Sequence, residues 1–223
     1  MVKIHKHLED IPDDIVIWRY MSLEKFLSLI ENKELYFCRV DLFEDKHEAT
    51  LPIIDKNNFY YSEENKNYWE NERKRHFVNC WIESPHELSL MWTAYAKDGL
   101  AIKTTAGNLK KSLNDSEENI YLSRVKYIDY NIDSSQDAGK PKNILKLLFS
   151  KRTLFEQENE IRLLHSDYYN KDESLKGKLI KTNIKVLIDE IITSPYTDDN
   201  FVNLIKTYLD SKGMDKKVVK SVL

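Results

Sequence analysis

Three charged side chains around residue 160 are the ones in this sequence best suited to chemistry. The segment from Phe155 to Arg162 alternates charged and apolar residues at the period of a β-strand. Residues two apart share one face of a strand, so Glu158, Glu160 and Arg162 are expected on one face and Ile161 on the other. Because neighbouring carboxylates repel, this pattern favours either a working site or pairing with cations on nearby strands.

The Glu-x-Glu spacing occurs in two overlapping registers. Glu158-Asn159-Glu160 is one of them, and Glu156-Gln157-Glu158 has the same spacing on the same face. Glu158 is the glutamate common to both registers. We therefore expect Glu158 to belong to whatever this surface does.

An acidic segment follows the second apolar strand-like stretch of the chain. Asp41, Glu44, Asp45, His47 and Glu48 offer oxygen and imidazole ligands of the kind that divalent cations use. Their order matches no known metal-binding loop spacing. The sequence therefore predicts an acidic surface turn and no metal site.

Two aromatic residues lie three positions apart on an expected helix. Trp92 and Tyr95, with Leu88 and Met91 beside them, form a stripe at helical spacing. Such a stripe usually packs against a sheet, so we expect these side chains in the core. Their other use would be to wall a ligand pocket.

Composition narrows the class of protein. The 223 residues suffice for one well-buried domain, and 34 basic against 37 acidic residues give a net charge of -3. This balance does not indicate nucleic-acid binding. Cys38 and Cys80 lack CxxC spacing and are expected to be buried thiols. No apolar stretch is long enough to span a bilayer, so we expect a cytoplasmic protein without membrane contact.

The elements that must position these residues mix strands with short helices. Strands are expected at 15–20, 35–38, 77–82, 100–104, 119–130, 155–162, 179–184, 190–193 and 217–222. Helices are expected from Ser22 as cap, over 62–76, from Pro85, near 144–151 and over 197–212 with Thr197 as cap. This irregular order predicts an α+β fold with a mixed, largely antiparallel sheet and short peripheral helices. Residues 1–14 are expected to be frayed, and 131–142 to form a mobile loop.

Several separated pieces of the chain resemble the bacterial family called domain of unknown function 2971. They are Arg19-Tyr20, Leu35 to Cys38, Phe43-Glu44-Asp45 with Glu48, Met91-Trp92, Tyr95-Ala96 with Gly99, and Lys151 with Phe155, Glu158, Glu160 and Arg162. The resemblance runs from about Ile15 to the last strand. Three positions depart from the family pattern: Cys38 stands for Ser, Glu44-Asp45-Lys46 for Asn-Asp-Pro, and Phe155 for Trp. The family name implies no activity.

A looser resemblance is to ADP-ribosyltransferases, which have a split sheet. Arg19 matches their first-strand Arg, Tyr36 to Cys38 their second strand, and Glu158-Asn159-Glu160 their late Glu-x-Glu, although the Ser or Thr cluster usual at Cys38 is missing. The resemblance implies NAD as cofactor and an unknown small-molecule or protein acceptor. It implies Glu160 as the catalytic carboxylate, Glu158 as the residue that orients the acceptor, and Arg19 and the Tyr36 region as part of the cofactor site. We also expect Tyr20, Trp92 and Tyr95 around the cofactor, and Asp45, Glu48, Lys151 and Arg162 as supporting residues.

Two other functions stay open on the sequence. One is a non-catalytic binding or regulatory module, in a stress or phage-defence context, where Glu158, Glu160 and Arg162 form a buried ion network around Lys151 and Arg19. The other is a metal-dependent hydrolase or nuclease that holds a cation with carboxylates of the acidic segment and of the late strand.

Overall fold

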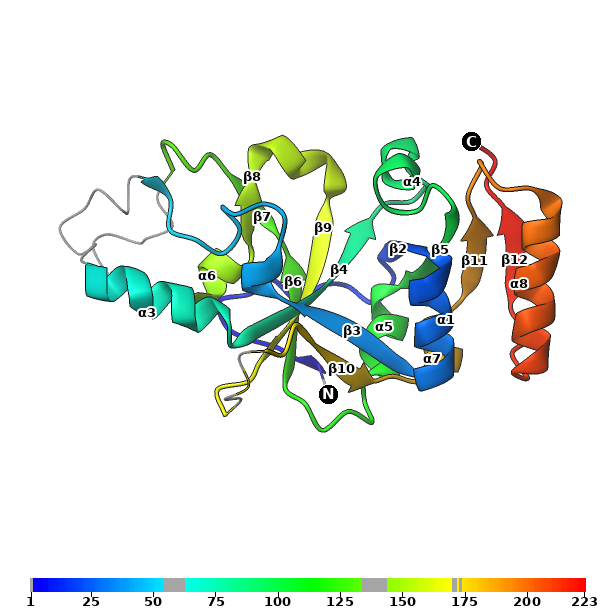
Figure 1. Ribbon diagram of the computed structural model, residues 1–223, viewed down its shortest axis with the longest axis horizontal. Helices are drawn as coiled ribbons and strands as arrows, with labels where there is room; N and C mark the ends of the chain where they lie inside the picture. The colour runs from blue at the N-terminus through cyan, green and yellow to red at the C-terminus, as the bar shows by residue number, and fades with distance from the viewer. Residues whose placement is uncertain (1, 54–62, 134–143, 170–171, 173) are drawn as a thin grey trace.

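The computed structural model describes residues 2–53, 63–133, 144–169, 172 and 174–223. Figure 1 shows short helices arranged around a strongly twisted sheet. The strands are β1 (Val2–Lys3), β2 (Val16–Ser22), β3 (Glu34–Arg39), β4 (His76–Glu83), β5 (Gly99–Thr105), β6 (Ile120–Arg124), β7 (Lys126–Ile128), β8 (Ser150–Arg152), β9 (Glu160–Ser166), β10 (Gly177–Lys181), β11 (Glu190–Thr193) and β12 (Lys217–Lys220). The helices are α1 (Leu23–Asn32), η1 (Val40–Leu42), α3 (Glu63–Arg73), α4 (Ser89–Tyr95), α5 (Ala106–Ser112), α6 (Ile144–Leu148), η2 (Thr153–Glu158), α7 (Ile184–Leu187) and α8 (Asp199–Ser211).

The main sheet runs in the order β1-β6-β9-β4-β2-β5-β11-β12, and β3 and β10 branch from β4. Most neighbours are antiparallel; β1 on β6 and β11 on β12 are parallel. A small parallel pair, β7 with β8, stands apart. The α+β class and the largely antiparallel mixed sheet expected from the sequence are confirmed.

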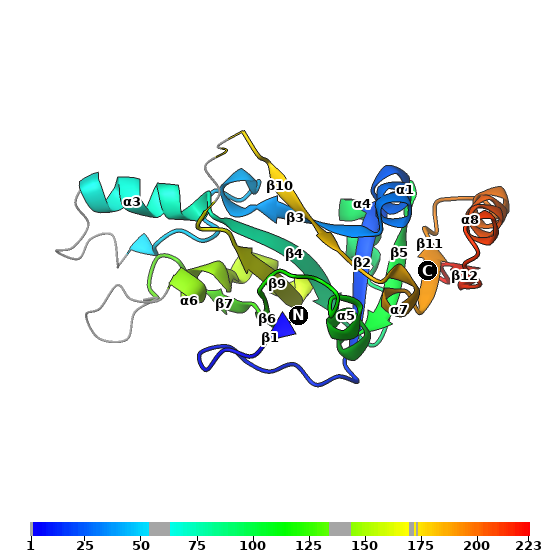
Figure 2. The same cartoon turned by 90° about the horizontal axis from the view of Figure 1, so that it is seen from below.

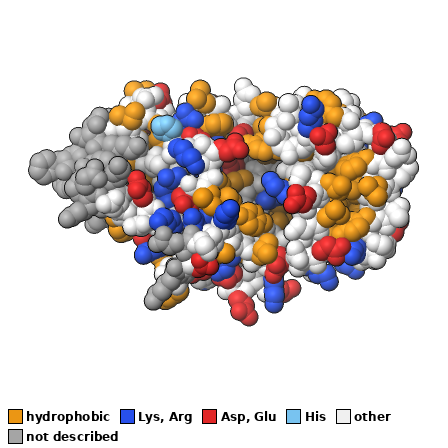
Figure 3. Space-filling view, viewed as in Figure 1, with side chains coloured by type: hydrophobic (Ala, Val, Ile, Leu, Met, Phe, Trp, Pro, Cys, Tyr) orange, Lys and Arg blue, Asp and Glu red, His pale blue; other side chains and the backbone are white. Residues whose placement is uncertain are grey.

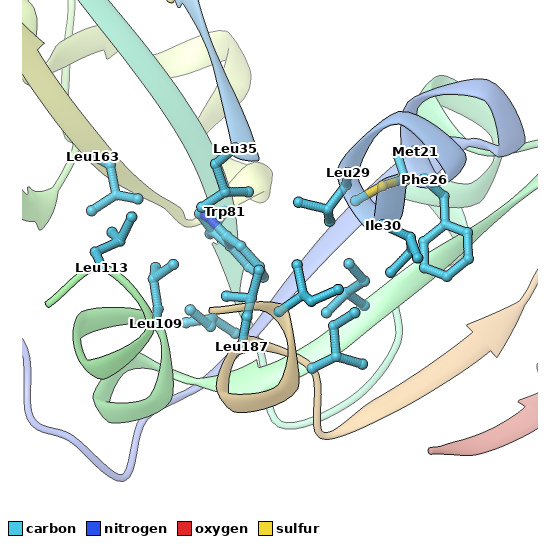
Figure 4. Packing of buried hydrophobic residues seen from close by; sticks show 14 of the residues in the cluster. Met21, Phe26, Leu29, Ile30, Leu35, Trp81, Leu109, Leu113, Leu163 and Leu187 are labelled. Carbon is cyan, nitrogen blue, oxygen red and sulfur yellow. The ribbon is translucent and has the colours of Figure 1, made fainter. Parts of the chain in front are cut away.

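The sheet has two different faces. On the core face, large apolar side chains meet α1, α5, α7 and α8 in one cluster, whose centre is the fully buried Trp81 of β4. Figure 4 shows Trp81 among Leu35, Leu109 and Leu187, which come from three other elements. The opposite face carries two smaller apolar clusters, one under α4 and one beside α6. We call this opposite side the network face, because charged residues lie between its two clusters.

The sheet forks at β4. One edge of β4 pairs with β9 from His76 to Ile82. The other edge is shared: Phe77 and Val78 pair with β3, whereas Ile82 and Glu83 pair with β2. Figure 2 shows β3 and β10 running at a steep angle to β2. Residues 79–81 therefore lie at a fork in which that edge of β4 has no strand partner within the described chain.

Local signals account for several element ends. Ser22 caps α1 as expected, since its side chain accepts a hydrogen bond from the backbone of Lys25. Helix α8 ends before Gly213, whose φ of 64° suits glycine. Its cap is Asp198 and not the expected Thr197, because the Asp198 carboxylate accepts the N–H of Phe201.

Other expectations need correction. Residues 2–14 are not frayed throughout: β1 pairs with β6, and Ile11 is buried. The strand expected over 119–130 is divided at Val125 into β6 and β7, which belong to different sheets. Most of the loop expected at 131–142 lies outside the described residues. No described helix combines the length and the apolar character needed to cross a membrane.

Candidate functional site

Lys151 is the point at which three carboxylates meet. Its Nζ lies 2.5 Å from Oε2 of Glu158, 3.0 Å from Oε2 of Glu160 and 3.4 Å from Oε1 of Glu48. The lysine is only 7% exposed. Three acids from separate segments thus share one buried ammonium group.

Arg162 ties two of these acids together from the other side. Its Nε donates to Oε1 of Glu160 and its Nη2 to Oε2 of Glu48, both at 2.7 Å. Its Nη1 donates to the carbonyl oxygen of Leu148 at 2.6 Å. The guanidinium is fully buried, with Phe43 over it. We call Glu48, Lys151, Glu158, Glu160 and Arg162 the charge network. The sequence predicted such a network around Lys151 and Arg19; the structure joins Glu48 to it, and Arg19 is not part of it.

Mutual attraction keeps Glu160 and Lys151 ionised despite their burial. Burial alone would raise the pKa of Glu160, but Arg162 and Lys151 outweigh it and lower this pKa to about 2. Burial alone would lower the pKa of Lys151, but Glu160, Glu48 and Glu158 outweigh it and raise this pKa. The network holds three carboxylates and two cations, so it carries one excess negative charge.

Glu158 and Glu160 reach Lys151 from different elements. Glu160 and Arg162 share one face of β9, as the alternation predicted. Glu158 is not on that strand: it ends the 3-10 helix η2, and Asn159, with a φ of 42°, turns the chain into β9. Glu158 and Glu160, one of the two possible Glu-x-Glu pairs, therefore both contact Lys151. No described contact joins Glu156 to the network.

Glu158 and Glu160 differ in accessibility. Glu160 is 3% exposed, and its two carboxylate oxygens are taken by Arg162 and Lys151. Glu158 lies nearer the surface, where its Oε1 accepts the hydroxyl of Tyr95 at 3.1 Å. Of the two glutamates, Glu158 is the one that a ligand could reach without breaking a buried ion pair.

Arg19 belongs to the fork and not to the charge network. Its Nη1 donates to the carbonyl oxygen of Cys80 at 3.4 Å, and its guanidinium lies 5.8 Å from the centre of the Trp81 ring. Within the described chain no carboxylate pairs with it, and burial lowers its pKa to about 10. The thiol of Cys80 in turn hydrogen-bonds to Glu160. Arg19 and Glu160 thus contact the same residue from different sides.

The aromatic residues proposed around a cofactor are divided. Tyr20 and Trp92 pack edge to face at 4.8 Å and are buried in the cluster under α4, so they cannot stack on a ligand. This corrects their expected place in the binding site and confirms that Trp92 is core. Tyr95 is half exposed and contacts Glu158, which corrects its expected burial. Tyr36 is also exposed, and its ring lies against Gly177.

The carboxylates of the acidic segment pair with different cations. Asp45 accepts from Nε of Arg152 at 2.9 Å, whereas Glu48 is buried in the charge network. The expected surface turn therefore holds for only part of the segment. Among the described residues, no group of three His, Cys, Asp or Glu side chains is placed to hold a metal ion.

Two network contacts were not anticipated from the sequence. Cys80 reaches Glu160 because its register partner on β9 is Arg162. The hydroxyl of Tyr127 accepts the backbone N–H of Glu160 at 2.8 Å. Both lie more than thirty residues away in sequence, and only strand pairing reveals them.

The visible surface is hollowed near its middle. Figure 3 shows this depression, with acidic and basic side chains around it, over the place where β4 ends beside β2 in Figure 1. A separate cleft of about 310 Å³ is lined by residues at the ends of β2, β5, β11 and β12. Its lining holds two lysines, Lys103 and Lys217, and two acids, Asp189 and Glu190, so its charges are already balanced, and both lysines pair with Glu190.

Comparison with known proteins adds no assignment. No protein-family model matches this chain, and no curated protein matches its sequence.

Proposed function

We propose that this chain is an ADP-ribosyltransferase-like enzyme that binds NAD across the fork, with Arg19 on the Trp81 side of the sheet and the charge network on the opposite side. The observation that carries the proposal is Arg19, a half-buried guanidinium that has no carboxylate partner among the described residues. Charged side chains removed from water are normally paired. An anionic ligand such as a pyrophosphate would supply the missing charge through the forked donors of the guanidinium.

The carboxylates next to the fork support the chemical part of the proposal. In the transfer step, the glycosidic bond between ribose and nicotinamide breaks, and nicotinamide leaves with the bonding electron pair. A carboxylate stabilises the oxocarbenium-like cation that develops on the ribose. The acceptor then forms the new bond to the same carbon and loses its proton.

Accessibility refines the roles of the two glutamates within this proposal. Glu158 would face the ribose, because it lies nearer the surface and contacts Tyr95. Glu160 would hold Lys151 and Arg162 in place, because both its oxygens already bind them. The catalytic role first expected for Glu160 thus passes to Glu158, and Glu160 becomes a positioning residue.

The test separates binding from chemistry. We expect NAD to raise the melting temperature of the unaltered protein, and we expect nicotinamide to be released during incubation. Arg19→Gln should remove the thermal shift. Glu158→Gln should keep the shift but abolish release, while Glu156→Gln, an exposed neighbour on η2, should behave like the unaltered protein. The proposal fails if NAD causes neither a thermal shift nor nicotinamide release.

The burial of the charge network favours a second candidate, a non-catalytic binding or regulatory module. Glu160 and Arg162 are as buried as core residues, and each is paired. In such a module the network would only hold β8 and β9 to the segment around Glu48. NAD would then have no effect, whereas Glu160→Gln would still destabilise the fold.

A further inference from the structure

Arg73 presents an edge of its guanidinium that has no partner among the described residues. Its Nε and Nη2 are both buried, and no described group hydrogen-bonds to them. These two atoms form the edge that holds both oxygens of one carboxylate or phosphate group. Arg73 is the last residue of α3.

The hydroxyl of Tyr130 is in the same state. It is buried, as is the whole of Tyr130, which is 4% exposed, and it has no hydrogen-bond partner within the part of the chain that the structure describes. Arg73 and Tyr130 influence each other's pKa, and Glu48 influences both, so the three groups lie close together. Unpaired buried donors of this kind are rare, and two of them within range of each other's charge indicate a ligand.

The carboxylates near Arg73 are occupied by other cations. Asp41 receives Nε and Nη2 of Arg39, and Glu48 binds Arg162 and Lys151. Glu70 is exposed and acts on Arg73 only through its charge. The neighbours of Arg73 therefore do not supply the acceptor oxygens that its free edge requires.

Other arginines of the chain show what this edge binds. Arg39 uses Nε and Nη2 to hold both oxygens of Asp41. Arg124 holds both oxygens of Glu83 in the same way, at 2.6 and 2.9 Å. We propose that Arg73 and Tyr130 form a binding site for a small oxyanion, a carboxylate or a phosphate group, separate from Arg19.

A structural role for Arg73 is the competing explanation. The charge network has one excess negative charge, and Arg73 could balance it through space, with water on its free edge. The two explanations differ in the effect of Arg73→Gln without a ligand. Removing an unpaired donor from an oxyanion site should leave the melting temperature unchanged or raise it, whereas removing a balancing charge should lower it.

The experiment measures the melting temperature of the full chain in sodium phosphate, sodium acetate or sodium chloride at matched ionic strength. We expect phosphate or acetate, but not chloride, to raise it with a saturating dependence on concentration. The anion that raises the melting temperature shows whether the site binds a phosphate or a carboxylate group. Arg73→Gln and Tyr130→Phe should weaken this response at least about tenfold, since each loses a direct donor.

Two control variants test whether the rise in melting temperature comes from the site at Arg73 and Tyr130. Arg75→Gln alters a partly exposed arginine two residues away that pairs with Glu72, and it should respond like the unaltered protein. Arg19→Gln should also respond normally, which separates this site from the proposed NAD site. The proposal is overturned if no anion gives a saturating rise, if Arg73→Gln keeps the rise or lowers the ligand-free melting temperature, or if Arg19→Gln abolishes the rise.

Discussion

Glu160 is the carboxylate that both cations of the charge network bind. Its carboxylate joins Arg162 to Lys151, and both cations are buried. Neutralising one partner of a buried ion pair leaves charge without compensation, which costs far more than an exposed pair contributes.

Glu160→Gln should therefore lower the free energy of unfolding by about 3–5 kcal/mol. The amide keeps the shape of the side chain but cannot balance both Arg162 and Lys151. Urea denaturation measures the change, with Glu156→Gln as a control because it removes an exposed carboxylate from the same segment. Equal stabilities of the two variants would contradict the structural importance of the charge network.

The charged residues could be singled out from the sequence, but the groups that surround them in the fold could not be predicted. Glu160 and Arg162 were expected on one strand face because alternation along a strand is a local property. The isolation of Arg19 could not be foreseen, since it depends on which groups three strands bring to the fork. The burial of Glu48 depends in the same way on contacts with distant β8 and β9.

At the scale of elements, the junction between η2 and β9 decides where Glu158 points. The charge alternation over 155–158 suggested a strand, yet these residues form a 3-10 helix. Alternating charges are also compatible with an exposed helical turn, so the pattern alone could not exclude one. Asn159 then supplies the left-handed backbone that links the two elements, and its Nδ2 donates to the carbonyl of Glu83 at 2.9 Å.

Substitutions at Asn159 should separate the backbone requirement from the hydrogen bond. Asn159→Gly loses the side-chain hydrogen bond but accepts a φ of 42°, whereas Asn159→Ala loses the bond and strains the backbone. We expect the alanine variant to be less stable than the glycine variant by about 1 kcal/mol. Denaturant titration of both variants tests this order, and an alanine variant as stable as the glycine variant would argue against the strained junction.

At the scale of the whole molecule, the fork separates two polar regions of the sheet. One is Arg19 with the carbonyl of Cys80, and the other is the charge network. The element types follow largely from local patterns, which is why the α+β class could be predicted. The sequence does not predict that β2 and β3 share one edge of β4, because no local signal shows that two strands compete for one edge. The fork leaves a β4 carbonyl to Arg19, while the charge network closes the network face beside it.

Two titrations should make the stability of the whole fold depend on pH in separate windows. His76 is fully buried, and its burial, with Arg75 and His165 nearby, lowers its pKa to about 4 from an ordinary 6.5. The unfolded chain then binds the proton first, so stability present above pH 6.5 is lost as the pH falls toward 4. The loss attributable to His76 is about 3 kcal/mol, at about 1.4 kcal/mol for each unit of pKa difference.

Glu160 acts in a lower window, since its pKa is about 2 in the fold against an ordinary 4.5. Its stabilisation is complete above pH 4.5 and is lost as the pH falls toward 2. Urea denaturation from pH 7 to pH 2.5 should show both losses in the unaltered protein. His76→Asn should flatten the upper window and Glu160→Gln the lower one. If instead either variant flattened both windows equally, the two buried groups would titrate as one unit, and the separation of His76 from the charge network would be wrong.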